Sequence, residues 1–188
     1  MVSGIGIFLL LTNVKKPKTA EDTISYLKSL QSYSCDFDME ISNDKQKLSY
    51  NGKQFYKKDK QYRIELGKNR VFTYKDDKIY VDDLEGNMKY STEKNFDSVF
   101  KLSIIQEFIR LLYTDEEVKY SFKTVENVNN LLIELNLPSG NRNMDKAILY
   151  VDFMTNLPKK LIIYDYKLTQ KIVINYRNFV PNYDIKSN

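Results

Sequence analysis

The sequence predicts an α+β domain in which one large, curved antiparallel sheet forms a half-open barrel, with an N-terminal helix and a mid-chain helix against its concave face. Four runs in the last third of the chain predict the sheet, because they alternate apolar and polar residues as strands with one buried face do. Shorter runs of the same kind, separated by turn residues, occupy the middle of the chain. Two other segments carry apolar residues at helical spacing, which predicts the helices.

The composition suits a single domain that uses neither a histidine-based mechanism nor a bound metal. A chain of 188 residues can bury a substantial core. It contains 15 Tyr and 10 Phe but no His, which excludes Ser–His, Cys–His and His–metal mechanisms. The sequence also lacks a glycine-rich phosphate loop and a Cys pair at metal spacing. We therefore expect no cofactor, no bound metal and no enzymatic activity.

Residues 1–18 are expected to form a signal-like or anchor segment, and residues 19–188 a single domain. The run Gly4–Leu11 is apolar but far shorter than the roughly 20 residues that span a bilayer. It resembles the apolar core of a secretion signal, although no Lys or Arg precedes it and no Cys directly follows it to accept a lipid. These features favour export over a buried N-terminal strand, and the lysines after the run would suit an atypical membrane anchor.

A short amphipathic helix and a strand open the domain. Thr19, followed by two acidic residues, marks the helix start, and Leu27 and Leu30 continue an apolar stripe up to about Tyr33. From Ser34 onward the period changes to two. The residues expected on the apolar side of this strand are Cys35, Phe37, Met39 and Ile41. Cys35 is thus expected to be a core residue and not a reactive thiol.

Nine or ten strands are expected in all. Five follow the first strand directly: Leu48–Lys57, Gln61–Leu66, Arg70–Tyr74, Lys78–Asp82 and Met88–Ser91. Four runs come later: Val118–Thr124, Leu131–Leu137, Ala147–Val151 and Leu161–Tyr176. A bulge is expected near Gly52, because Tyr50 and Phe55 are an odd number of residues apart and would otherwise face opposite sides.

The second helix is expected from about Ser98 or Ser103 to Tyr113. Ser103 and Gln106 have the spacing of a capping box at a helix N-terminus. An apolar stripe follows at helical spacing: Ile105, Phe108, Ile109 and Leu112. This stripe would pack against the concave face of the sheet.

Charge and aromatic residues predict two sets of functional residues. Between Lys45 and Lys78 the chain carries eleven basic and four acidic residues, which either solvate exposed strands or attract an acidic partner. Tyr and Arg dominate many interfaces, because they bury large areas with little loss of entropy. The candidate partner-binding residues are therefore Tyr56, Tyr62, Arg63 and Arg70. The residues expected to line or fill the concave groove are Phe37, Met39, Ile64 and Phe108.

Other readings of these patterns are weaker. Aromatic residues next to basic ones could stack on single-stranded nucleic acid. A strand with aromatic residues on one face and charges on the other explains the same alternation, so no nucleic-acid partner is expected. The acidic pairs Asp76-Asp77 and Asp82-Asp83 stand at predicted strand ends, where turn formation explains them better than cation binding or acid catalysis.

Several segments resemble the LolA-type lipoprotein-carrier family. They are Leu30–Ser34, Asn51–Lys58, Gln61–Ile64, Lys75–Val81 and Asn156–Asp165. The resemblance covers nearly everything after residue 20 and implies the half-open barrel. The Lys-, Asn- and Tyr-rich composition without Trp resembles that of proteins from AT-rich Gram-positive bacteria, and among such proteins the chain is similar to the clostridial GerS family of spore-germination lipoproteins.

Similarity to the GerS family implies an exported, non-enzymatic accessory protein that binds and supports a zinc-dependent N-acetylmuramoyl-L-alanine amidase of the CwlD type during maturation of the spore cortex. It also implies a location at the membrane, through the N-terminal apolar segment, or in the forespore intermembrane space, with a homodimer as a further option. The LolA-type carriers imply an alternative function, transport of lipid or lipoprotein acyl chains in the concave groove. The sequence leaves both functions open, because residues that fill a groove and residues that line it look alike.

Overall fold

The computed structural model describes residues 18–43, 45–93, 98–113, 118–137 and 142–184, and these form three helices and eleven strands. The helices are α1 (Ala20–Ser29), α2 (Ser98–Ser103) and α3 (Ile105–Leu111). The strands are β1 (Ser32–Ser42), β2 (Lys47–Lys57), β3 (Gln61–Leu66), β4 (Arg70–Lys75), β5 (Lys78–Asp83), β6 (Met88–Glu93), β7 (Lys119–Val125), β8 (Val128–Asn136), β9 (Lys146–Asp152), β10 (Pro158–Tyr164) and β11 (Gln170–Pro181). Apart from Lys18, the expected signal-like or anchor segment lies outside the described residues. Within the described ranges no helix has the length and apolar character needed to cross a membrane.

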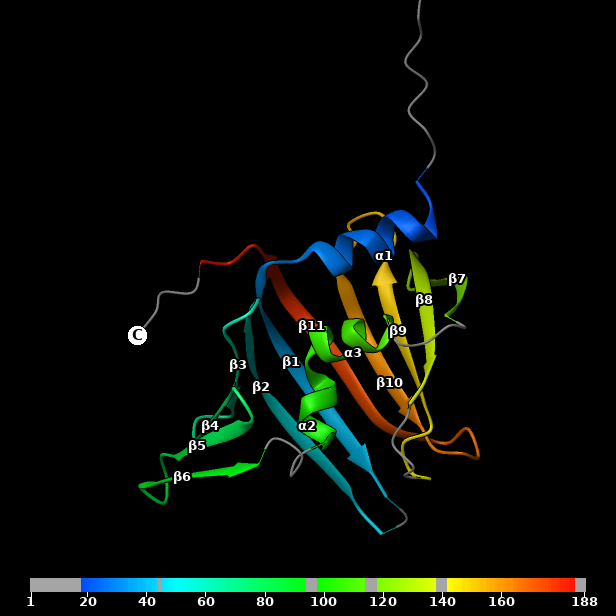
Figure 1. Ribbon diagram of the computed structural model, residues 1–188. Coiled ribbons are helices and arrows are strands. Elements are labelled where there is room, and N and C mark those ends of the chain that lie inside the picture. Colours follow the sequence, from blue (N-terminus) through cyan, green and yellow to red (C-terminus); the bar gives the residue numbers. More distant parts are fainter. Residues whose placement is uncertain (1–17, 44, 94–97, 114–117, 138–141, 185–188) are drawn as a thin grey trace, which may run out of the picture.

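All eleven strands belong to one antiparallel sheet with the order β6-β5-β4-β3-β2-β1-β11-β10-β9-β8-β7. The last strand, β11, returns to the middle of the sheet and pairs with β1. The sheet curves around α2 and α3, which lie against its concave face, and α1 runs across one end (Figure 1). The predicted α+β architecture with a half-open barrel is therefore confirmed.

The first helix begins where the sequence predicts. The Thr19 hydroxyl accepts a hydrogen bond from the Asp22 backbone N–H at 3.2 Å, and the Asp22 carboxylate accepts one from the Thr19 N–H at 2.8 Å. This reciprocal capping box satisfies two backbone donors that the helix itself cannot pair. The Thr23 hydroxyl then donates to the Asn156 side-chain oxygen at 2.9 Å, which ties α1 to the turn between β9 and β10.

The residues expected in the groove form the core. They are at most 1% exposed: Phe37, Met39, Ile64 and Phe108. Cys35 is buried beside them, and burial raises the pKa of its thiol well above the ordinary value. The predicted stripe of the second helix is also buried, with Ile105 and Ile109 at most 1% exposed. The concave face of the sheet is thus covered by the apolar side of α3.

The bulge expected at Gly52 is wrong. β2 pairs with β1 and with β3 without a register shift. The inner face continues through Gln54 and Tyr56, so Phe55 lies on the outer face, where its ring centroid is 6.1 Å from that of Tyr183. The sequence prediction failed because it placed the apolar Phe55 inside and did not allow for a buried glutamine.

Gln54 is tolerated in the core because it pairs with Ser103, where the expected single helix breaks into α2 and α3. The Ser103 carbonyl accepts hydrogen bonds from Gln54 Nε2 at 2.8 Å and from the Tyr176 hydroxyl at 2.8 Å. The Ser103 hydroxyl donates to the carbonyl three residues earlier at 2.6 Å. The expected capping box is therefore wrong, since Ser103 ends α2 and Gln106 instead donates to the Leu27 carbonyl at 3.4 Å.

The run expected as one long strand from Leu161 to Tyr176 is a hairpin of β10 and β11. The Asp165 carboxylate makes the turn by accepting backbone hydrogen bonds from Lys167 at 2.9 Å and Thr169 at 2.8 Å. Leu168 adopts a positive φ of 63°. The turn was missed because it contains neither Gly nor Pro, so the apolar alternation continues through it.

The two hydrogen bonds to the Ser103 carbonyl can be tested by removing their donors. We expect Gln54→Leu and Tyr176→Phe each to lower the free energy of unfolding by about 0.5–1.5 kcal/mol. The double variant should lose more than the sum, because only then is the buried carbonyl without a donor, which costs about 1–3 kcal/mol. Urea denaturation of the four proteins measures this. Strictly additive losses would contradict the shared-acceptor role of Ser103.

Gly52 can be tested by adding one methyl group. A Cβ atom there would overlap the Glu65 carbonyl oxygen and lie 2.9 Å from the Phe37 ring. We expect Gly52→Ala to lower the free energy of unfolding by about 1–3 kcal/mol, as overpacking of a core does. Asn51→Ala, on the exposed neighbouring position, is the matched control and should change stability by less than about 0.5 kcal/mol. Equal stability of Gly52→Ala and the natural protein would show that the strands shift to admit the methyl group.

Candidate functional site

Four tyrosines form a row across the concave face. Tyr33, Tyr56, Tyr62 and Tyr74 stand directly opposite one another on β1, β2, β3 and β4. The ring centroids of Tyr33 and Tyr56 are 5.3 Å apart, and those of Tyr56 and Tyr62 are 5.5 Å apart with the planes at 18°. Such cross-strand aromatic pairs stabilise a sheet and hold their rings in fixed positions. We call these four residues the tyrosine row.

A pocket of about 400 Å³ lies between the tyrosine row, α3, the end of α1 and the β2–β3 turn. Three members of the row line it, together with the residues of the turn. The basic residues lining the pocket are Lys28, Lys57, Lys58, Lys60 and Arg110, and the acidic ones are Asp59 and Asp76. The pocket therefore combines aromatic hydroxyl groups with an excess of positive charge.

A buried carboxylate connects α3 to the tyrosine row. Glu107 is 4% exposed and pairs with Arg110 at 3.0 Å and with Lys101 at 3.8 Å. Burial and then the charge of Glu107 raise the pKa of Tyr62, which also donates a hydrogen bond to this carboxylate. Burial, above all, raises the pKa of Tyr56 to about 12. Both hydroxyls therefore keep their protons at neutral pH and can act as donors.

The structure separates the four predicted partner-binding residues. Tyr56 and Tyr62 belong to the tyrosine row on the concave face. Arg63 lies on the outer face and pairs with Glu65 at 2.8 Å. A hollow of about 500 Å³ lies beside it there, and Tyr80, which also lines this hollow, is 46% exposed. We call Arg63 and Tyr80 the outer patch.

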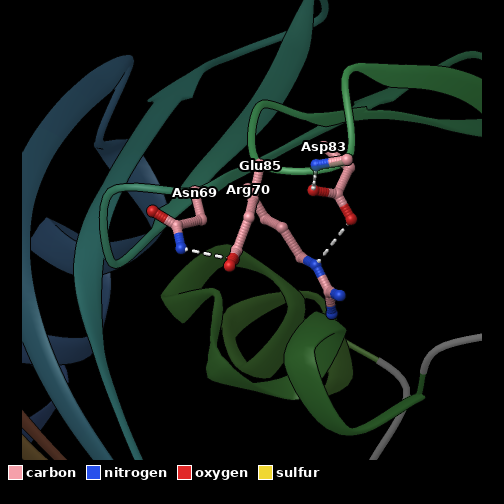
Figure 2. Close-up of polar contacts among 5 residues, drawn as sticks. Asn69, Arg70, Asp83 and Glu85 are labelled. Atoms are coloured by element: carbon pink, nitrogen blue, oxygen red, sulfur yellow. Dashed lines mark hydrogen bonds and ion pairs between the residues drawn. The ribbon is translucent and has the colours of Figure 1, made fainter.

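Arg70 is engaged inside a turn network at the far end of β4 (Figure 2). Its Nε donates to the Asp83 carboxylate at 3.2 Å, and Asp83 also accepts a hydrogen bond from the Gly86 N–H at 3.0 Å. Beside this pair, the Asn69 amide donates to the Glu85 carboxylate at 2.7 Å. The contacts join the β3–β4 and β5–β6 turns. Arg70 thus has a structural role in this structure, and so does Asp83, which the sequence analysis assigned to turn formation.

Sequence reasoning missed half of the tyrosine row although the signal was present. The predicted turn around Asp59 pairs Tyr56 with Tyr62, since each is three residues from it. A hairpin centred on Lys68 pairs Tyr62 with Tyr74, each six residues from it. Register counting from the turns would therefore have extended the row to β4. Glu107 and Lys28 contribute to the pocket only through the packing of the helices, so counting strand register from the turns could not have identified them.

The described residues contain no group of three or more Cys, Asp or Glu side chains positioned to hold a metal ion. The arrangement found here is one of binding surfaces. A polar, basic pocket opens on the concave side, and an aromatic and charged patch lies on the outer side of the same sheet.

The model of the family described as sporulation protein YdcC-like matches residues 1–188, the whole chain. No curated protein matches the sequence.

Solved structures share the fold. An uncharacterized conserved protein from Thermus thermophilus is 7% identical, with a TM-score of 0.58 over 88% of this chain and 87% of that one. The structure of the CwlD amidase from Clostridioides difficile in complex with the GerS lipoprotein contains a chain 22% identical, with a TM-score of 0.48 over 93% and 99%. A LolA superfamily protein from Nitrosomonas europaea is 9% identical, with a TM-score of 0.42 over 90% and 96%. The structural neighbours thus include both groups that the sequence resembles.

The Asp83 carboxylate should make stability depend on pH. The hydrogen bond from Gly86 lowers the pKa of Asp83 below the ordinary 3.8, against the effect of burial, and the Arg70 charge adds to the lowering. The stabilising effect of this charge is therefore fully present above the ordinary value and is lost as pH falls through the lowered one. We expect Asp83→Asn to lower the Tm at pH 7, and the difference from the natural protein to shrink below about pH 4.

Asp82→Asn is the control for this measurement. Asp82 points to the other face, where its carboxylate pairs with the exposed Lys89 at 3.0 Å. Exposed pairs contribute little, so this variant should change the Tm by less than Asp83→Asn does. A constant difference between Asp83→Asn and the natural protein from pH 7 to pH 2.5 would contradict the role of the Asp83 charge.

Proposed function

Because this chain belongs to the family of YdcC-like sporulation proteins, we propose that it is a non-enzymatic accessory protein that binds and supports a cell-wall amidase during spore formation. The partner class follows from the resemblance to the GerS family, and a GerS lipoprotein has been seen in complex with the CwlD amidase. The partner is then a zinc-dependent N-acetylmuramoyl-L-alanine amidase of the CwlD type. The protein acts after export, in the forespore intermembrane space or at the membrane.

The observation that favours a partner protein over a carrier is the filled concave face. A carrier of acyl chains needs an open apolar groove, but here the buried side of α3 occupies that position. Side chains from β2 and β11 form hydrogen bonds to the chain at the Ser103 break, so α2 and α3 are fixed to the concave face of the sheet. Polar and charged side chains contribute much of the lining of the hollows found over the described residues. We therefore infer that the protein acts by binding a partner at its surface.

The outer patch is the surface we assign to the amidase. Its arginine and its exposed tyrosine are residue types that carry much of the binding energy of protein interfaces. Arg63 lies within the segment Lys45–Lys78, whose eleven basic and four acidic residues would attract an acidic surface of the partner. Tyr56, Tyr62 and Arg70 are less suited to this contact, because they are committed to the tyrosine row and the turn network.

Mixing the purified chain with a CwlD-type amidase tests the proposal. We expect co-elution in size-exclusion chromatography. Arg63→Glu should weaken the complex by about 1–3 kcal/mol if Arg63 is an anchor, without unfolding the domain. Arg177→Glu is the matched control, because Arg177 is also an outer-face arginine in an exposed ion pair, with Asp38 at 2.7 Å. It should bind like the natural protein.

Two outcomes would contradict the proposal in different ways. Separate elution of the two proteins at several salt concentrations would refute the amidase as partner, and a lipid extracted by organic solvent from the purified chain would then support the carrier. Equal weakening by Arg63→Glu and Arg177→Glu would leave the amidase as partner but refute the outer patch as its specific site.

A further inference from the structure

We propose that the pocket between the tyrosine row and α3 binds an acidic sugar, a ring rich in hydroxyl groups that carries a carboxylate. This goes beyond the proposed function, because the amidase is assigned to the opposite face of the sheet. Binding of such a sugar would be a property of this chain alone. The inference depends on the charges, the ring arrangement and the size of the pocket.

The charges indicate an anionic ligand. Lys58 and Lys60 line the pocket and form no ion pair with any acidic residue that the structure describes. Lysines elsewhere on the sheet commonly have such partners, as Lys47 does with Glu40 at 2.8 Å. The ammonium group of Lys28 lies 4.3 Å from the centre of the Tyr113 ring at the pocket wall. Three cations thus surround the space without a carboxylate of their own, although Asp59 and Asp76 also line it.

The rings indicate a polar ligand and not a flat aromatic one. Tyr33 and Tyr62 cover the two sides of Tyr56, so the row cannot offer that ring face to a nucleobase. The Tyr62 hydroxyl already donates to Glu107, so what remains available is ring edges and the Tyr56 hydroxyl, which suit the hydroxyl groups of a sugar. Tyr113 at the pocket wall is 65% exposed, and Lys28 already lies over its ring.

The remaining lining supports the same class of ligand. Gln61 and Gln106 line the pocket, and the Gln61 side chain offers an amide donor and acceptor, whereas Gln106 already donates to the Leu27 carbonyl. A volume of about 400 Å³ lies in the range of small-molecule sites. An acyl chain would leave the lysine charges unpaired and would find few apolar side chains besides Ile109. A carboxylate would instead form charge-assisted hydrogen bonds with them.

Isothermal titration of the purified full chain with two matched probes tests the inference. One probe is a tetrasaccharide of alternating N-acetylglucosamine and N-acetylmuramic acid, which carries carboxylates. The other is chitotetraose, which has similar rings and no carboxylate. We expect the acidic tetrasaccharide to bind about tenfold more tightly or better, which corresponds to about 1.4 kcal/mol, and to weaken as salt is added.

Two paired-lysine variants locate the binding. Lys58→Gln with Lys60→Gln should weaken binding of the acidic tetrasaccharide about tenfold. Lys45→Gln with Lys68→Gln removes the same charge from exposed turns at the opposite end of the sheet and should have little effect. Arg63→Glu should also leave sugar binding unchanged, so a failure of the amidase proposal and a failure of this inference can be told apart.

Several results would overturn the inference. These are no binding of the acidic tetrasaccharide, equal binding of chitotetraose, or equal weakening by the two lysine pairs. Inorganic phosphate and AMP serve as competitors. If phosphate alone displaces the sugar completely at equal concentration, the pocket is a simple anion site, and if AMP binds more tightly, the assigned ligand class is wrong.

Discussion

The position of the helices depends on one carbonyl group, that of Ser103. The break between α2 and α3 frees it from helical hydrogen bonding, and Gln54 and Tyr176 reach it from β2 and β11, on either side of β1. An unpaired buried carbonyl is costly, so these two donors fix the height and direction of the helix pair above the sheet. From this point α3 carries its apolar side into the core and brings Glu107 over Tyr62. The pocket beside the tyrosine row exists only because α3 is held there.

Most of the fold could be predicted from local patterns, and the errors have a common cause. Alternation located the strands and Thr19 marked the first helix, because both signals depend on neighbouring residues. Gln54 and Phe55 were placed on the wrong faces, because the rule that polar residues point outward fails where a buried hydrogen-bond partner is present. Ser103 was read as a cap for the same reason, since its partners come from strands far away in the sequence. Asp165 made a turn by side-chain hydrogen bonds, which apolar alternation does not reveal.

The candidate site was predictable in part. Tyr56 and Tyr62 were predicted to bind a partner, and this role remains a prediction; the structure shows that they are neighbours in the tyrosine row. Arg63 follows Tyr62 directly, so strand geometry alone places the two on opposite faces. Grouping them as one surface ignored this rule. The contribution of Glu107 could not be foreseen, because it depends on where the broken helix lies.

The division between the two faces has a consequence for how the protein can act. β3 contributes Tyr62 to the pocket and Arg63 to the outer patch, so one strand serves both surfaces with alternate side chains. A protein bound to the outer patch would leave the pocket open on the other side of the sheet. Sugar and amidase would therefore not compete for the same side chains. An accessory protein built in this way can hold a partner protein on one face of its sheet and an acidic sugar on the other.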